Sequence, residues 1–150
     1  MGESLRERAL RMLGRRDYAR LELAHKLMPH AESAAQVYAL LDDLTARGLL
    51  SDERYALARV SARSGRVGDA QLAYELRLKG VAGELVSAAI ATGEDELSRA
   101  WRVWQRKFAR QPALAADDVV ARSRQMRFLA GRGFSAETIR RVLRGDLEDD

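Results

Sequence analysis

Apolar side chains recur along this 150-residue chain with the spacing of amphipathic helices rather than the alternation of strands. The clearest stripe combines Leu97, Trp101, Trp104 and Phe108 at intervals of three and four residues, which predicts that both tryptophans share one buried helical face. Core packing is the favoured role for the stripe, and a cofactor-binding or base-stacking role is the alternative. Ala and Leu supply 46 residues against 14 from Val, Ile and Thr, so the sequence favours helix throughout and contains no convincing strand.

Glycine, proline and small hydroxyl residues divide the periodic stretches into about nine short helices. Ser33, Ser51, Thr92 and Ser135 are placed to accept the free N–H groups of helix first turns, and Gln36 has the capping-box spacing from Ser33. We expect helices over residues 4–14, 17–28, 33–47, 51–64, 68–79, 83–92, 94–110, 115–130 and 135–145.

One sequence pattern typical of helix C-termini recurs along the chain. At intervals of 53 residues, the aligned positions are Leu23, Leu76 and Leu129 in one column and Lys26, Lys79 and Arg132 in another. In "ARGLLS", "LKGVAG" and "GRGFSA" a cation precedes a glycine and an apolar residue follows, which predicts a left-handed glycine that ends the helix and an apolar side chain that folds back on it. The spacing of Glu22 to Lys26 and of Glu75 to Lys79 predicts two ion pairs within helices.

The repeat predicts an all-α fold of three tandem three-helix units. Each unit is too small to bury much apolar surface alone, so we expect the units to stack into an elongated, curved molecule. We place the units at residues 1–50, 51–92 and 93–145, followed by an acidic tail at 146–150.

Positive charge is concentrated in the last third of the chain. The overall net charge is +4, but residues 99–144 carry +9, residues 1–98 carry −1 and residues 145–150 carry −4. Such a field indicates a polyanion or an acidic protein surface as partner, although solvated helix faces give similar counts. The residues we expect to bind a partner or DNA are Arg77, Lys79, Arg122, Arg124, Arg127, Arg132, Arg140, Arg141 and Arg144.

Signals for catalysis and metal binding are weak. The chain has no cysteine, and His25 and His30 are five residues apart, a spacing that does not put two imidazoles on one helical face. "GRVG", Gly65 to Gly68, matches the Gly-x-x-Gly loop of KH domains, but without a sheet beside it a plain turn is the better interpretation. We therefore expect no enzyme activity and no cofactor, and we expect a cytoplasmic monomer without a membrane span.

Three segments resemble the RecX family of recombinase regulators. They are "ALRMLGRRDYARLELAHKL" (Ala9 to Leu27), "ARGLLSDERYALARVSAR" (Ala46 to Arg63) and "RQMRFLAGRGFSAETIRRVL" (Arg124 to Leu143), and together they place nearly the whole chain within the resemblance. The chain departs from the family pattern in lacking a glycine after Lys26 and in its acidic tail.

The resemblance implies a non-enzymatic protein that binds the RecA recombinase along the helical groove of its filament on single-stranded DNA. It would limit filament growth or promote disassembly, and so restrain strand exchange, filament ATPase and co-protease activity. The alternative is a helical protein that binds DNA or RNA directly without a recombinase partner. Affinity for bare single-stranded DNA as high as affinity for recombinase filaments would favour that alternative.

Overall fold

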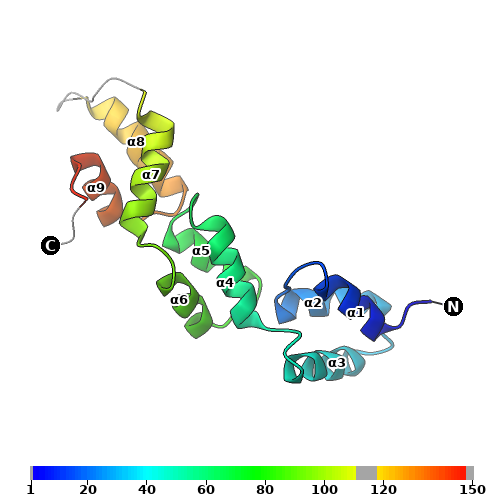
Figure 1. Cartoon of the computed structure of the whole chain (residues 1–150). Helices are drawn as coiled ribbons and strands as arrows, with labels where there is room; N and C mark the ends of the chain where they lie inside the picture. The colour runs from blue at the N-terminus through cyan, green and yellow to red at the C-terminus, as the bar shows by residue number, and fades with distance from the viewer. Residues whose placement is uncertain (1, 111–117, 148–150) are drawn as a thin grey trace. The chain divides into compact units, whose positions relative to one another are not determined.

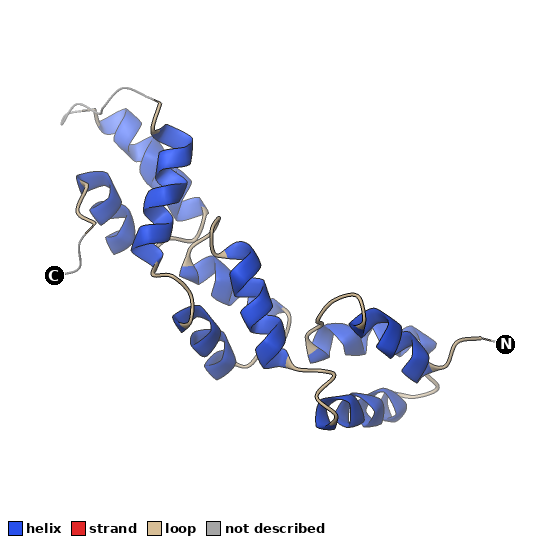
Figure 2. Ribbon diagram, in the orientation of Figure 1, coloured by secondary structure: helices blue, strands red, loops and turns tan. Residues whose placement is uncertain are grey.

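The computed structural model describes residues 2–110 and 118–147, and these residues form nine α-helices and one short 3₁₀ helix. Figure 1 gives their order along the chain, and in Figure 2 every regular element of the described residues is helical, which confirms the all-α prediction. The elements are α1 (Leu5–Leu13), α2 (Arg20–Leu27), η1 (Met28–His30), α3 (Ala34–Ala46), α4 (Asp52–Arg63), α5 (Asp69–Leu78), α6 (Gly83–Ala91), α7 (Glu96–Phe108), α8 (Val119–Gly131) and α9 (Ala136–Arg144).

The chain divides into two compact units. The first contains residues up to Arg59 together with Leu76–Ala89, and the second contains Val60–Glu75 together with residues from Ile90 onwards. The division falls within α4, α5 and α6. The sequence boundaries of the three-helix units stay a prediction. Over the described ranges, no helix combines the length and apolar character needed to cross a membrane.

The core of the first unit is built where α2 packs against both α1 and α3. Leu23 and Leu27 of α2 meet Leu41 and Leu44 of α3, and each of these side chains is fully buried. Removing a leucine side chain from water contributes about 1.5–3 kcal/mol, so this cluster is a main source of stability for helices of 8 to 13 residues. The short 3₁₀ helix takes the place of the glycine turn that the sequence lacks after Lys26.

Three helix endings share the predicted backbone geometry. Gly48, Gly80 and Gly133 have φ of 74°, 79° and 87°, a region that glycine reaches without a Cβ penalty. In each case the residue after the glycine donates its backbone N–H to the carbonyl oxygen of a buried leucine five residues earlier. The pairs are Leu49 to Leu44 (2.9 Å), Val81 to Leu76 (3.1 Å) and Phe134 to Leu129 (3.3 Å). This is the Schellman pattern that the sequence predicted.

The apolar residue that closes each ending differs in one place from the prediction. Val81 and Phe134 fold back and are buried, whereas Leu49 is exposed and Leu50 is buried instead. The connection from Gly48 to α4 at Asp52 is one residue longer than the connections from Gly80 to α6 and from Gly133 to α9, and in it the second leucine rather than the first faces the core.

Side-chain caps begin most helices as expected, with one correction. Ser33, Ser51 and Ser135 accept from the N–H groups of Gln36, Arg54 and Thr138 at 3.1, 3.1 and 3.2 Å. Thr92 is not the cap of α7. That helix begins later, and Asp95 accepts from the N–H of Ser98 at 3.0 Å. A carboxylate also interacts favourably with the helix dipole, which gives Asp95 the advantage over a threonine three residues further away.

The second unit contains the tryptophan stripe, on α7 against α8 and α9. Leu97 and Phe108 are buried, while Trp101 and Trp104 are only partly buried and stack with ring centroids 5.1 Å apart. The indole N–H of Trp104 donates to Gln125 Oε1 at 2.8 Å. The shared face is therefore confirmed, and the stripe serves core packing.

Candidate functional site

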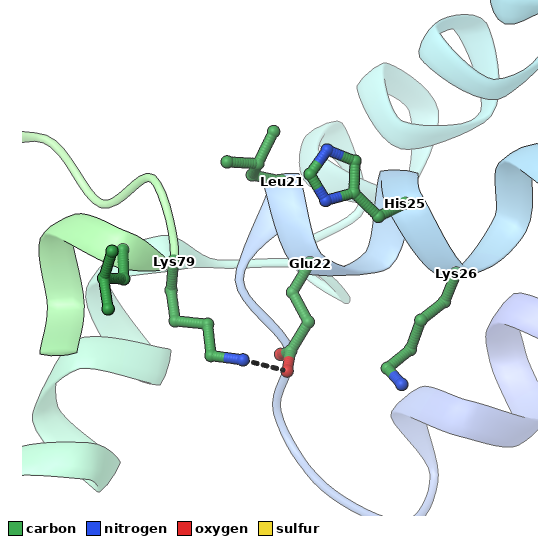
Figure 3. A pocket seen from close by; sticks show the side chains of 6 residues that line it. Leu21, Glu22, His25, Lys26 and Lys79 are labelled. Carbon is green, nitrogen blue, oxygen red and sulfur yellow. Dashed lines mark hydrogen bonds and ion pairs between the residues drawn. The ribbon is translucent and has the colours of Figure 1, made fainter.

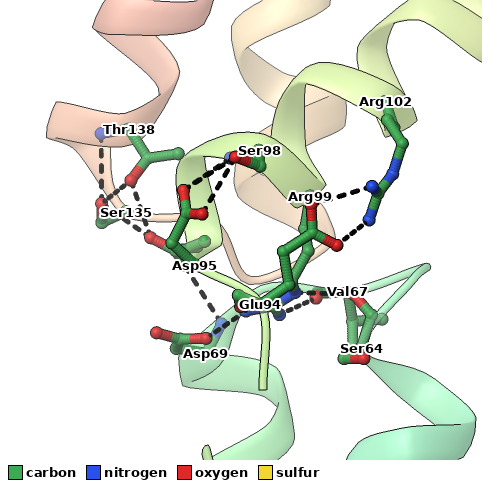
Figure 4. Close-up of polar contacts among 11 residues, drawn as sticks. Ser64, Val67, Asp69, Glu94, Asp95, Ser98, Arg99, Arg102, Ser135 and Thr138 are labelled. Atoms are coloured by element: carbon green, nitrogen blue, oxygen red, sulfur yellow. Dashed lines mark hydrogen bonds and ion pairs between the residues drawn. The ribbon is translucent and has the colours of Figure 1, made fainter. Parts of the chain in front are cut away.

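The α4–α5 turn, residues 64–68, contains the "GRVG" sequence and is a plain turn between two helices. The guanidinium of Arg99, on α7, holds this turn, as Figure 4 shows. Its guanidinium donates to the carbonyl oxygens of Ser64 (2.7 Å) and Val67 (2.6 Å) and pairs with Asp69 (2.6 Å). Arg99 is only 2% exposed, so these three partners replace the water that a buried cation loses.

Two further arginines donate to the carbonyl groups that lie between those of Ser64 and Val67 in the chain. Arg106 donates to the carbonyl of Gly65, and Arg132 donates to the carbonyl of Arg66 at 3.5 Å. Four consecutive carbonyl oxygens of the turn therefore each accept a hydrogen bond from a guanidinium. The N–H of Gly68 completes the arrangement by donating to the Arg132 carbonyl at 2.7 Å.

Glycine is required where this turn meets the end of α8. A Cβ on Gly68 would lie 2.3 Å from the Gly133 carbonyl oxygen, and a Cβ on Gly133 would lie 2.5 Å from Gln71 Cβ. Both approaches are too short for any side chain. The close backbone packing holds the α4–α5 turn firmly against the α8–α9 junction.

A groove of about 390 Å³ opens beside the turn, and we call it the cationic groove. Four cations and two nonpolar side chains line it: Arg66, Arg106, Lys107, Arg132, Val103 and Phe128. All four cations are exposed, and among the described residues no carboxylate lines the groove. Lys107 Nζ and the Arg132 guanidinium lie 5.3 and 5.0 Å from the centre of the Phe128 ring, within cation–π range.

The arginines that the sequence assigned to α8 and its end are placed differently from one another. Arg124 and Arg127 are exposed on α8, whereas Arg122 is partly buried. Arg132, just beyond the helix, is the one member of the predicted set that lines the cationic groove. Arg132 shares the groove with Arg106 and Lys107 of α7 and with Arg66 of the α4–α5 turn.

On α9, the chain's own tail already contacts two of the three predicted arginines. Asp146 Oδ2 lies 3.6 Å from Arg144 Nη2 and 3.9 Å from Arg141 Nε, while Arg140 is exposed. Asp146 also donates its backbone N–H to the Arg141 carbonyl at 2.9 Å. The first acidic residue of the tail therefore partly neutralises this end of α9.

The two predicted ion pairs within helices are replaced by longer-range pairs. Lys79 Nζ bonds to Glu22 at 3.2 Å, as Figure 3 shows, and Arg16 bonds to the same carboxylate at 3.1 Å. Lys26 lies beside Glu22 without bonding to it. In the second unit Glu75 pairs with Arg63 at 3.1 Å, so the predicted pairing to Lys79 is also wrong.

The physical reason is burial. The Glu22 side chain is only 8% exposed, so its carboxylate takes the two cations that reach it across the fold in place of a solvated neighbour on its own helix. Burial by itself would raise the pKa of Glu22, but the hydrogen bonds from Arg16 and Lys79 outweigh it and the pKa is lowered. Arg77, the other predicted residue on α5, is exposed.

Sequence reasoning missed three members of the cationic groove. Arg66, Arg106 and Lys107 belong to separate elements from Arg132, and only the fold brings them together. A local signal existed on α7, where Arg106 and Lys107 fall outside the apolar stripe. Nothing in the sequence connects those residues to the α4–α5 turn. In the described part of the chain, no group of three or more His, Asp or Glu side chains could hold a metal ion.

Comparison with known proteins places the chain in a family. Models of the second and third three-helix domains of RecX match residues 51–90 and 94–143. "Regulatory protein RecX" of Chromobacterium violaceum is 42% identical over 149 residues, covering 99% of this chain and 95% of that protein. The namesake of Leptothrix cholodnii is 45% identical over 149 residues, covering 98% and 92%.

Solved structures agree in fold. The crystal structure of RecX from Lactobacillus salivarius matches with a TM-score of 0.82 at 17% identity, covering 95% of this chain and 94% of the other. A crystal structure of regulatory protein RecX matches with a TM-score of 0.75 at 20% identity, covering 92% and 70%. The predicted architecture of tandem three-helix units is confirmed, and the chain belongs to the RecX family of regulatory proteins.

Proposed function

We propose that this protein is a non-enzymatic regulator that binds filaments of the RecA recombinase on single-stranded DNA. It acts in the cytoplasm as a monomer and restrains the filament's ATPase, strand-exchange and co-protease activities, and so modulates DNA repair and the SOS response. The observation that carries the proposal is the 42% identity to a protein named "Regulatory protein RecX" over 99% of this chain. Similarity of that extent covers every helix rather than one module.

The basic surface supports the proposal physically. Residues 99–144 carry a net charge of +9, which complements an acidic protein face or DNA phosphates. We propose units at 1–50, 51–92 and 93–145, with the contact residues concentrated in the third. The contact residues we propose are Arg77, Lys79, Arg122, Arg124, Arg127, Arg132, Arg140, Arg141 and Arg144.

The test is the DNA-dependent ATPase of RecA in the presence of the purified protein. We expect the protein alone to have no ATPase or nuclease activity, and to lower the RecA rate at or below a one-to-one ratio. An unchanged RecA rate at saturating protein would contradict the regulatory proposal.

A second candidate function is direct binding of DNA or RNA without a recombinase partner. The cationic groove favours it, because four exposed cations converge there and no carboxylate of the described residues lines it. The two functions separate when affinity is compared for bare single-stranded DNA and for RecA filaments on the same DNA. Regulation predicts a clear preference for the filament, whereas direct binding predicts equal affinities.

A further inference from the structure

The cationic groove has the features of a preformed anion site. Its cations come from three parts of the second unit: Arg66 from the α4–α5 turn, Arg106 and Lys107 from α7, and Arg132 from the end of α8. We propose that this groove binds the phosphodiester backbone of a single-stranded nucleic acid. The inference deepens the proposed function, because a RecA filament contains single-stranded DNA, but it requires no recombinase.

The positive charge of the groove is not compensated from within. Arg106 and Arg132 donate to backbone carbonyl groups, which orient each guanidinium but leave its charge intact. Arg66 and Lys107 form no ion pair with any carboxylate of the described residues. Arg102, which also belongs to α7 but does not line the groove, differs because it is paired with Glu94.

The scaffold beneath the groove is closely packed. Buried Arg99 holds the turn through the carbonyls of Ser64 and Val67, and the backbones of Gly68 and Gly133 are in direct contact. The guanidinium groups of Arg106 and Arg132 are therefore oriented before any ligand arrives. Preorganisation of this kind reduces the ordering cost of binding, which is a main opposing contribution to affinity.

The lining of the groove favours a phosphodiester over an acidic protein segment. Protein interfaces depend on apolar anchors that fill pockets, and the nonpolar lining of the described residues consists of Val103 and Phe128. Val103 is 5% exposed, and Phe128 is partly covered by the cations that stack on it. A nucleic-acid backbone requires no apolar burial, because released counterions supply the driving force. Three of the four cations are arginines, which bind phosphate oxygens in bidentate fashion.

The experiment measures binding of fluorescently labelled oligo(dT) to the full chain by anisotropy across a salt series, without RecA. The double variant Arg66→Gln with Lys107→Gln removes two cations that make no hydrogen bond to the turn through their side chains. We expect roughly twentyfold weaker binding at 0.1 M salt and a slope of log K against log salt that is flatter by about 1.4, since each neutralised single-strand phosphate contributes about 0.7.

Arg102→Gln is the matched control, because it removes one cation from an exposed, paired position on the same helix. It should change affinity by less than about twofold, within the range expected of an exposed ion pair. If Arg102→Gln and the double variant lose the same affinity for oligo(dT) per charge removed, the groove is not the binding site. Lys107→Gln alone provides the comparison should the double variant lose its helical circular dichroism signal.

Two further probes distinguish the kind of ligand. Oligo(dT) with an uncharged methylphosphonate backbone should bind at least about tenfold more weakly than the phosphodiester, as recognition through phosphate charge requires. Poly-glutamate should bind more weakly than oligo(dT) and should discriminate less between wild type and the double variant. If poly-glutamate binds as tightly as oligo(dT) and is equally sensitive to the double variant, the ligand of the groove is an acidic protein segment and not a nucleic acid.

Discussion

At the scale of single residues, the most informative side chain is a buried arginine that no local pattern indicated. Arg99 lies on α7, yet its partners Ser64 and Val67 are 35 and 32 residues earlier in the chain. Sequence periodicity describes which face of a helix is apolar, and it cannot identify a cation whose partners come from another element. Buried charges of this type depend on the complete fold.

Arg99→Lys should destabilise the protein by about 1–3 kcal/mol, because a lysine cannot reach both carbonyl groups and at least one is left buried without a partner. Urea unfolding followed by circular dichroism measures the difference. Arg102→Lys on the same helix is the matched control and should stay within about 0.5 kcal/mol of wild type, since its pair with Glu94 is exposed. Similar costs for the two variants would show that Arg99 does not hold the turn.

Glu22 makes stability depend on pH in a predictable direction. Its pKa is lowered in the folded state, so it contributes stability above the unfolded value of about 4.3, and that contribution is lost as pH falls through the folded pKa. Glu22→Gln should cost about 1–3 kcal/mol at pH 7, where Arg16 and Lys79 lose a charged acceptor. The difference from wild type should shrink as pH is lowered to about 3, below that unfolded value.

Asp42→Asn provides the comparison for Glu22. Asp42 pairs with Arg20 at 2.7 Å, but its side chain is 72% exposed. Its removal should change the free energy of unfolding by less than about 0.5 kcal/mol at either pH. A cost for Glu22→Gln that is independent of pH would mean that the ionised carboxylate is not the stabilising group.

At the scale of helices and turns, most of the structure could be predicted from the sequence. Helix endings are local: a cation, a glycine and an apolar residue are sufficient to specify the left-handed glycine and its hydrogen bonds at Gly48, Gly80 and Gly133. Helix starts are nearly as local, and Thr92 failed as a cap because Asp95 is a stronger competitor nearby. Predicted ion pairs within helices failed for a different reason, since Glu22 is buried against cations from other segments.

Two of these glycines should respond differently to alanine. Both Gly48→Ala and Gly133→Ala place a Cβ at positive φ, which costs about 1–2 kcal/mol. Gly48 has open space around it, whereas a Cβ on Gly133 would lie 2.7 Å from the backbone nitrogen of Gln71. Gly133→Ala should therefore cost about 1–3 kcal/mol more than Gly48→Ala in urea unfolding. Equal costs would contradict the close packing of the turn against the α8–α9 junction.

The arginines of α9 test the predicted contact surface separately from the groove. Arg140→Gln, Arg141→Gln and Arg144→Gln together should weaken binding to RecA filaments and flatten its salt dependence by about 0.7 for each phosphate that the protein no longer neutralises. Arg141 and Arg144 should contribute less than Arg140, because Asp146 lies beside both of them. Filament co-sedimentation across a salt series measures both quantities.

The control for this triple variant lies in the first predicted three-helix unit, residues 1–50, where positive and negative charges nearly balance. Arg6, Arg8 and Arg11 pair with Asp43 and Glu3 on the surface, so their replacement by glutamine removes the same number of charges without exposing a core. We expect little loss of filament affinity from this control. An equal or larger loss would place recognition outside the basic third of the chain.

At the scale of the whole molecule, sequence predicted the class of fold and the presence of a basic region, but not where its charges converge. The all-α architecture follows from composition and periodicity, which are properties of the chain read in order. The cationic groove joins Arg66 to Lys107 and Arg132, which are 41 and 66 residues away in the sequence. Of the predicted contact residues, only Arg132 lies in it, because counting charge by region does not reveal convergence in space.

Regulation of RecA filaments is the central claim, and it is tested most directly by the length of labelled filaments on single-stranded DNA followed in time by fluorescence microscopy. Wild-type protein added during growth should halt extension or shorten the filaments at concentrations at or below that of RecA. The regulator could also limit growth merely by occupying bare DNA. Preformed filaments that leave no DNA bare are therefore included at the same regulator concentration as a control. Filaments that grow and persist equally with and without saturating protein would contradict the claim.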